Sequence, residues 1–413
     1  MAAYDLAVVG GGIGGSALAT VMARAGRSVL LLEQSQAYVD RVRGEWIAPW
    51  GVTEVKRLGL YDLLREAGGH HVTRHVTYDE TRTPAEAEGR TLPLSLFAPD
   101  VPGPLCLGHP KHCQTLFDAA RAAGADARRE ISVTGLDLGP APSVTFVQDG
   151  REHTARARLV VGADGRTSQV RETAGIVLRQ DTPHHWFAGL LVEGADGWDD
   201  QLQAIGTEGD FGFLAFPQGG GRVRVYGGYA LDQAKRFKGP EGARRFLDAF
   251  DMACSPPNRS LVAGRPAGPL YSYVNADAWT DQPFAEGVVL VGDAAGWNDP
   301  IVGLGLSITY RDVRLVSDIL KASDDWSPAA LAPYGEERAE RMRRLRFAAS
   351  IQAALDMEFG PEAAARRRRY HERSAADPSL GLHGVAVMAG PEVAPAEFFT
   401  PESRARVLGL ERA

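Results

Sequence analysis

The sequence predicts an α/β fold in which a parallel nucleotide-binding sheet carries an inserted, mostly antiparallel sheet and is followed by a helical carboxyl-terminal region. Three observations predict it. An apolar strand runs into a glycine-rich turn and a helix at the amino terminus, two later strands end in an acidic residue beside glycine, and a run of short strands lies between those two. We expect the nucleotide-binding fold at residues 1–75, 101–178 and 283–325, the inserted sheet at 76–100 and 179–282, and a helical cap and tail at 326–413.

The first unit has the pattern of a Rossmann-type dinucleotide site. Residues 5–9 read as a buried strand and residues 17–25 as a helix. In the GxGxxG spacing between them, Gly10 allows the tight turn, Gly12 lets the backbone approach a pyrophosphate, and Gly15 lets the helix pack closely on the strand. The residues that we expect to contact the dinucleotide here are Gly10, Gly12, Ile13, Gly14 and Gly15.

The second strand, residues 28–32, ends at Glu33, about 20 residues beyond the glycines. A carboxylate at this position accepts hydrogen bonds from the hydroxyls of an adenosine ribose. The phosphates then meet the amino terminus of the first helix, where free N–H groups favour an anion. This pattern alone leaves the choice between FAD and a nicotinamide dinucleotide open.

Two later motifs narrow that choice. Residues 159–161 form a buried strand that leads to Asp164 and Gly165, and residues 287–290 form another that leads to Gly292 and Asp293. An acid at the carboxyl end of a parallel strand faces the ligand crevice. After the second of these strands come Pro300, Gly303, Leu304 and Gly305, and then a helical pattern over about residues 306–320.

In this order and spacing, the three motifs resemble those of flavoprotein monooxygenases of the para-hydroxybenzoate hydroxylase type, over about residues 4–345. The resemblance implies FAD as the cofactor, with Asp293 on its ribityl chain and Asp164 and Gly165 near its phosphates. It matches Arg43 to the family's basic residue before a glycine, and His109 to the family's arginine opposite the flavin. The helix start at Gly303 and Gly305 would donate N–H groups toward the reduced flavin. The other residues of this segment that we expect to contact FAD are Gly292, Pro300 and Leu304.

The turn at Asp293 departs from the usual family pattern, because it reads Gly-Asp-Ala-Ala-Gly. This variant also occurs in flavin-dependent halogenases and in prenyl reductases related to geranylgeranyl reductase. Residues 211–217 lack the tryptophans that the halogenases carry, which counts against halogenation. A second GxGxxG unit is missing, which fits NADH or NADPH docking transiently on the FAD domain.

The inserted strands between about His184 and Tyr229 are expected to form the floor of a substrate pocket. An aromatic lining suits a flat apolar substrate, and we place Trp46, Phe213, Tyr226 and Trp297 in it. Our candidates for catalytic residues are His184, Tyr226 and Pro300, with the histidine or tyrosine taking a proton from a ring hydroxyl. His185 is a further candidate, but adjacent residues on a strand point to opposite faces, so at most one of the two histidines faces the pocket.

Composition excludes several other kinds of protein. The chain has 413 residues, is 44% hydrophobic, carries a formal charge of -7 and has three cysteines, none in a metal-binding spacing. Charges of both signs alternate along it, and no apolar run approaches the roughly 18 residues that span a bilayer. We therefore expect a cytoplasmic protein without metal, nucleic-acid or membrane contacts, as a monomer or homodimer.

The sequence thus predicts an FAD-dependent, NAD(P)H-consuming monooxygenase. It would insert one oxygen atom from O2 into an aromatic or polycyclic small molecule through a flavin C4a-hydroperoxide. Two alternatives stay open. One is a flavin-dependent prenyl or olefin reductase or a halogenase, and the other is a non-catalytic flavoprotein sensor.

Overall fold

The computed structural model describes residues 2–410, and one of its two large sheets is the predicted parallel one. Within these residues it has eight strands, in the order β20-β21-β11-β1-β2-β8, with the hairpin β9–β10 attached to β11. The strands are β1 (Ala2–Val9), β2 (Val29–Leu32), β8 (Asp126–Arg128), β9 (Ser132–Asp137), β10 (Ser143–Gln148), β11 (Arg151–Gly162), β20 (Phe284–Ala285) and β21 (Val288–Leu290). β1, β2, β8, β11 and β21 are parallel, and Val9 lies opposite both Gly162 and Leu32. These strands therefore end at one common edge.

The inserted sheet also has eight strands within the described range, in the order β17-β13-β16-β15-β14-β5-β6, with β18 beside β13. Its strands are β5 (Arg74–Asp79), β6 (Leu92–Pro93), β13 (His185–Glu193), β14 (Leu202–Glu208), β15 (Phe211–Gly219), β16 (Arg222–Tyr229), β17 (Arg265–Pro266) and β18 (Tyr271–Asn275). All of its pairs are antiparallel except β14 with β5. The mostly antiparallel insertion is thus confirmed.

Two short sheets join these parts. One contains β3 (Trp46–Ile47), β4 (His70–His71) and β7 (Leu105–Cys106), and the other contains β12 (Arg179–Gln180), β19 (Ala278–Trp279) and β22 (Gly296–Trp297). In the chain, β3 follows β2 and β22 follows β21, and both β2 and β21 belong to the parallel sheet. Trp46 and Trp297 therefore lie where the two large sheets meet.

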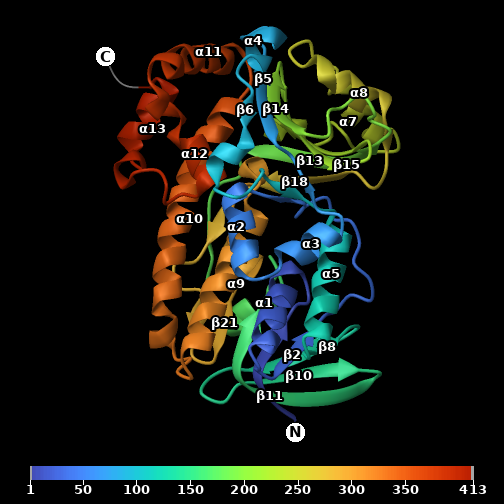
Figure 1. Cartoon of the computed structure of the whole chain (residues 1–413), viewed down its shortest axis with the longest axis vertical. Coiled ribbons are helices and arrows are strands. Elements are labelled where there is room, and N and C mark those ends of the chain that lie inside the picture. The colour runs from blue at the N-terminus through green and yellow to red at the C-terminus, as the bar shows by residue number, and fades with distance from the viewer. Residues whose placement is uncertain (1, 411–413) are drawn as a thin grey trace.

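Helices cover both large sheets (Figure 1). α1 packs against α5 and α9, and α9 also packs against α2 and α10. α10 runs along one side of the molecule, with α11, α12 and α13 gathered beside it. The helices are α1 (Ile13–Arg24), α2 (Pro49–Arg57), α3 (Tyr61–Glu66), α4 (Pro84–Glu88), α5 (His109–Ala122), α6 (Gln169–Thr173), α7 (Gly242–Asp248), α8 (Arg259–Ala263), α9 (Gly305–Ala322), α10 (Pro328–Asp356), α11 (Pro361–Ala376), α12 (Leu382–Ala389) and α13 (Pro401–Leu408).

The predicted fold class is confirmed by this arrangement, including the helical carboxyl-terminal region. The β9–β10 hairpin is an element that the sequence did not reveal, because its strands are only partly buried and alternate weakly. Over residues 2–410, none of the helices combines the length and the apolar character needed to cross a membrane.

Candidate functional site

A cavity of about 610 Å³ opens at the edge where the parallel strands end. Its wall at one end consists of the glycine turn after β1, Glu33 after β2 and the turns after β11 and β21. At the other end its wall comes from the inserted sheet, through Phe187, Phe216 and Tyr226. We call these two parts the dinucleotide end and the aromatic end.

The glycine turn has the geometry that the spacing predicted. Gly10 has φ +100°, and a Cβ there would overlap the carbonyl oxygen of Ala163. A Cβ on Gly15 would overlap the carbonyl oxygen of Gly10, so this glycine allows α1 to pack on β1. At Gly12, in contrast, a Cβ would meet no atom of residues 2–410 within 4 Å, although the residue lines the cavity. Gly12 therefore keeps space free for a ligand, while Gly10 and Gly15 serve the fold.

Glu33 is held at the carboxyl end of β2. The backbone N–H of Gly11 donates to its Oε2 at 2.8 Å, and that of Ser35 donates to its Oε1 at 2.7 Å. The carboxylate lines the cavity and each oxygen keeps a lone pair for another donor. This orientation suits the hydroxyls of a ribose.

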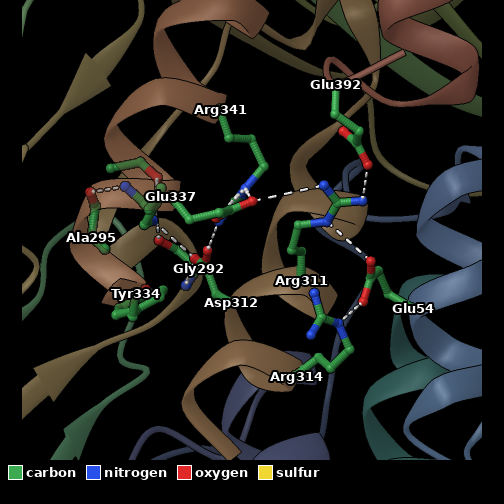
Figure 2. A network of polar contacts seen from close by, with 12 residues as sticks. Glu54, Gly292, Ala295, Arg311, Asp312, Arg314, Tyr334, Glu337, Arg341 and Glu392 are labelled. Carbon is green, nitrogen blue, oxygen red and sulfur yellow. Dashed lines mark hydrogen bonds and ion pairs between the residues drawn. The ribbon is translucent and has the colours of Figure 1, made fainter. Parts of the chain in front are cut away.

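The turn Gly292–Ala295 is held by a buried ion pair between α9 and α10 (Figure 2). Asp312 and Arg338 are both fully buried, with Arg338 Nε 3.1 Å from Asp312 Oδ2. The same carboxylate oxygen accepts the N–H of Gly292 at 2.9 Å. Arg338 donates further to the carbonyl oxygens of Ala295, at 2.9 Å, and Gly296, at 3.1 Å. We call this pair the turn clamp.

Sequence reasoning missed the turn clamp, because it treated the charged stretch after residue 325 as a helical cap that closes the pocket or contacts a second subunit. Figure 2 shows that the network continues through Arg341, which donates to Asp312 Oδ1 at 2.7 Å, and through Arg311 and Arg314, which share Glu54 on α2. The sequence signal was the many arginines and glutamates at i, i+4 spacings over residues 334–347, a pattern that occurs on exposed helices as well.

Asp293 itself projects from the clamped turn into the cavity, where Arg166 Nε lies 3.2 Å from its Oδ2. Arg41 and Arg43 line the same region. Burial lowers the pKa of the Arg43 guanidinium, and Asp293 opposes that shift. Arg41, Arg43 and Arg166 therefore bring positive charge to the part of the dinucleotide end that contains Asp293.

His109 lies in the first turn of α5 and lines the cavity beside Gly44. Burial lowers its pKa to about 4, and the nearby charges of Arg43 and Arg41 act in the same direction. The imidazole is therefore neutral at neutral pH. Asp164 also lines the cavity, but its carboxylate accepts hydrogen bonds from the Ser168 hydroxyl and the Val170 N–H, which holds the start of α6.

The segment that leads into α9 brings Pro300, Gly303 and Gly305 to the cavity. The other predicted cofactor-contacting residues that line it are Ile13, Gly14, Gly165 and Gly292. Gly303 has φ +67°, and a Cβ there would press on the Trp46 ring at 3.1 Å. The expectation for Leu304 needs a correction. Its side chain is 1% exposed and packs in the core with Ile301 and Ile308, because α9 buries that face against α10.

The aromatic end contains Trp46, Tyr226 and Trp297, as expected, and also Phe187, Phe216 and Tyr273, which sequence reasoning missed. Phe187 stacks on Tyr226 with ring centroids 5.6 Å apart, and Trp46 contacts Phe216 at 5.7 Å. The guanidinium of Arg166 lies 5.1 Å from the ring centre of Trp297. The rings come from strands that are far apart in the sequence.

The placement of Phe213 in the pocket was wrong. This side chain is fully buried on the opposite face of β15, where it packs on Phe250 at 5.9 Å beneath α7. β15 is buried on both faces, so its sequence gives no hydrophobic alternation that distinguishes the two sides. Phe216, three residues later, points to the cavity instead.

The expectation for His184 also needs correction. It lines a second cavity of about 310 Å³, with Nε2 at 3.2 Å from Oδ2 of Asp299. Burial raises the pKa of Asp299 to about 7. His184 precedes β13, so strand alternation does not orient it, and its ring turns toward α10 and away from the aromatic end. Asp299 separates the cavities, because its neighbours Asn298 and Pro300 line the larger one.

Tyr226 lines the cavity, but its hydroxyl donates to Glu45 Oε2 at 3.1 Å. Burial and the Glu45 carboxyl raise the pKa of this phenol well above its usual value. The Tyr226 phenol therefore keeps its proton at neutral pH. This geometry does not fit the predicted role of Tyr226 as a general base.

Residues 3–348 match the protein family described as an FAD binding domain. The chain belongs to this family. It is an FAD-dependent oxidoreductase, and the resemblance to flavoprotein monooxygenases in the sequence motifs is confirmed.

Known relatives differ in the reaction that their names give. Ubiquinone hydroxylase UbiL from Rhodospirillum rubrum is 28% identical over 400 residues, which are 88% of this chain and 84% of that protein. Digeranylgeranylglycerophospholipid reductase 1 from Methanococcoides burtonii is 29% identical over 350 residues, 80% of this chain and 78% of that protein. Among solved structures, p-nitrophenol 4-monooxygenase PnpA from Pseudomonas putida DLL-E4 has a similar fold, with a TM-score of 0.75 and 20% identity over the full length of both chains.

The dinucleotide end fits FAD. The space kept free at Gly12 lies at the amino terminus of α1, where an anionic pyrophosphate is stabilised. Glu33 presents lone pairs for a ribose, and Asp293 presents a carboxylate further along the cavity. At Gly305 a Cβ would meet no atom of the described chain within 4 Å, so the start of α9 is open to a flat ring.

Proposed function

We propose that this FAD-dependent oxidoreductase is an NAD(P)H-consuming monooxygenase that inserts one atom of O2 into an aromatic or polycyclic small molecule. The observation that carries the proposal is the wall of six aromatic side chains at the far end of the FAD cavity. A flat apolar substrate buries its faces against such rings. The hydroxylase and monooxygenase among the similar proteins support the reaction class.

FAD, when bound, supplies the redox chemistry, accepting hydride and activating oxygen. The residues of the chain bind, orient and exclude water. The turn clamp fixes Asp293, and the N–H groups at the start of α9 would provide a positive dipole toward a bound flavin ring. His109 is neutral and would add no charge to the cavity that receives the ring. The aromatic end keeps water away from the reacting centre.

The alternative is a prenyl or olefin reductase, which the similarity to digeranylgeranylglycerophospholipid reductase 1 favours. Such a substrate would occupy the same apolar cavity. It needs reduced flavin but no oxygen, so the two reactions differ in their first observable step.

A rapid-mixing experiment separates the two. Photoreduced holoenzyme is mixed with oxygenated buffer while flavin absorbance is followed, with and without chloride or bromide. We expect a transient absorbance distinct from those of reduced and oxidised flavin, and its decay should not depend on halide. Direct return to the oxidised spectrum, or no reaction with oxygen, would contradict the monooxygenase proposal and favour the reductase.

A further inference from the structure

Two histidines and an aspartate gather beside the second cavity, away from the FAD cavity. His184 precedes β13, His185 begins it, and Asp299 follows β22. One atom of a metal-binding kind from each side chain lies within 4.8 Å of the other two. His184 Nε2 is 3.2 Å from Asp299 Oδ2, and His185 Nε2 is 3.6 Å from Asp299 Oδ1. Ligand atoms that share one Zn2+ at about 2.0–2.2 Å lie about 3–3.5 Å apart, so these distances are close to those of a ligand set.

Asp299 is held with one oxygen presented to the histidines. Its Oδ1 accepts the backbone N–H of Ile301 at 2.9 Å, and its own N–H donates to Asp277 Oδ1 at 2.7 Å. The side chain is 1% exposed, yet Oδ2 has no hydrogen-bond partner among residues 2–410, because the nearby His184 Nε2 is not aligned to donate to it. A buried carboxylate oxygen without a partner is costly, which indicates that a bound group completes it.

The two imidazoles differ in their freedom to move. The His185 side chain is 1% exposed, and its ring meets Phe187 edge-on with centroids 6.0 Å apart. The Nδ1 atoms of His184 and His185 are 2.7 Å apart, and both Nε2 atoms lie toward Asp299. Ligation through both Nε2 atoms places a proton on each Nδ1. The His184 side chain is 43% exposed, so its ring has room to turn and separate those protons.

The charges around the second cavity favour a cation. Asp181, Asp277 and Asp299 line it. Arg346 brings one positive charge to the same wall, where its guanidinium lies 3.9 Å from the centre of the Trp279 ring. With the three carboxyls ionised, the wall keeps a net negative charge, which a divalent cation neutralises.

From these contacts we propose that His184, His185 and Asp299 form a binding site for one divalent transition-metal ion such as Zn2+. Imidazole suits Zn2+, Cu2+ and Ni2+, whereas Mg2+ and Ca2+ prefer oxygen ligands. Three protein ligands leave a further position for water, and the cavity of about 310 Å³ provides space for it. Sequence spacing predicted no metal, because Asp299 lies far along the chain from the histidine pair.

The proposed metal site shares a wall with the FAD cavity. Asn298 and Pro300, the neighbours of Asp299, line the FAD cavity. A metal ion on Asp299 would therefore hold this wall from the side opposite to FAD. It takes no part in the proposed reaction, so the site does not depend on which reaction the flavin performs.

Calorimetric titration of FAD-loaded, chelator-treated protein with Zn2+ tests the site, at about pH 8 so that the ligands are deprotonated. We expect one Zn2+ per chain and no measurable binding of Mg2+. His184→Ala and Asp299→Asn should each weaken Zn2+ binding at least about tenfold. The second change keeps an oxygen that can accept the Ile301 N–H. His153→Ala is the control, because His153 is exposed on β11 and lines neither cavity.

Cu2+ gives a readout that a loss of stability does not imitate. The electron paramagnetic resonance spectrum of oxidised protein with one equivalent of Cu2+ should show coupling to two ligand nitrogens, and His184→Ala should leave one. Thermal unfolding and FAD content establish that each variant is folded, and His184→Ala decides alone if Asp299→Asn does not load FAD. Absence of Zn2+ binding by the wild type, unchanged affinity in His184→Ala, or equal binding of Mg2+ would each overturn the proposal.

Discussion

The two ends of the cavity are built in different ways. The dinucleotide end consists mainly of backbone at the ends of parallel strands, and its last turn is fastened by a fully buried ion pair. The aromatic end consists of side chains from β3, β13, β15, β16, β18 and β22, which meet only in the folded protein. The first end is therefore specified by short local motifs and the second by which face each strand presents. We therefore expect the dinucleotide end to tolerate few substitutions and the aromatic end to tolerate more.

The largest effect should come from breaking the turn clamp. Arg338→Met leaves Asp312 buried with only part of its compensation and frees the carbonyls of Ala295 and Gly296. We expect a loss of about 3–5 kcal/mol in the free energy of unfolding and at least about tenfold weaker FAD binding. Urea unfolding and flavin fluorescence titration measure these. Arg343→Met on the same helix removes an exposed pair with Glu340 and one hydrogen bond to the Phe399 carbonyl oxygen, and should cost no more than about 1 kcal/mol. Unchanged FAD affinity in Arg338→Met would show that the turn does not depend on the clamp.

Two substitutions in the glycine turn should have different effects, one on the stability of the fold and the other on FAD binding. Gly15→Ala forces a methyl group onto Gly10 and should lower the free energy of unfolding by about 1–3 kcal/mol. Gly12→Ala has room in the folded chain, with φ -69° at that residue, and should leave the stability of the FAD-free protein unchanged. Its methyl group would occupy the space of the phosphates and weaken FAD binding about tenfold. If Gly12→Ala binds FAD normally, the phosphates do not pass this position.

At the aromatic end, Phe213→Leu and Phe216→Leu should have opposite signatures. Phe213→Leu changes the core beneath α7, so we expect it to cost about 1 kcal/mol of stability without altering the affinity for 2-naphthol, a flat aromatic probe. Phe216→Leu should weaken 2-naphthol binding several-fold with a comparable or smaller loss of stability. Thermal unfolding and calorimetry on both variants provide the comparison, and an effect of Phe213→Leu on binding would challenge the assignment of faces on β15.

An effect that is absent at neutral pH is a change in the pH dependence of stability at His112, which joins α5 to α9 through Tyr310. Burial lowers its pKa to about 3, below the roughly 6.5 of an unfolded chain. The unfolded state therefore binds the extra proton, and the stability present above pH 6.5 is lost as the pH falls, at up to about 1.4 kcal/mol per unit. His112→Gln should reduce that slope between pH 6 and 4 in urea unfolding experiments. Above pH 7 the two proteins should have parallel profiles, and identical slopes in acid would contradict the burial of a neutral imidazole.

Local motifs made the dinucleotide end predictable. The positions of Gly10, Gly12, Gly15 and Glu33 follow from backbone rules that operate over about 25 residues, and the structure puts each of them at the glycine turn or the cavity. Asp293 followed from a strand end and a family resemblance. These signals do not require knowledge of the rest of the chain.

The remaining features depend on contacts between distant segments. Phe213 and Phe216 could not be told apart, because β15 is buried on both faces. His184 was misplaced because it lies one residue before β13, where alternation does not apply. The pairing of Asp312 with Arg338 requires the packing of α9 on α10, which no periodicity in either helix reveals.

The turn clamp also sets the order of events during synthesis. The glycine turn at residues 10–15 is made well before Arg338, which together with Asp312 and Arg171 fastens the turn that carries Asp293. At about 5–20 residues per second, the interval between the two is roughly 16 to 65 s. During that interval a nascent chain holds only part of the cofactor site, so we expect loading with FAD to follow the release of α10 from the ribosome.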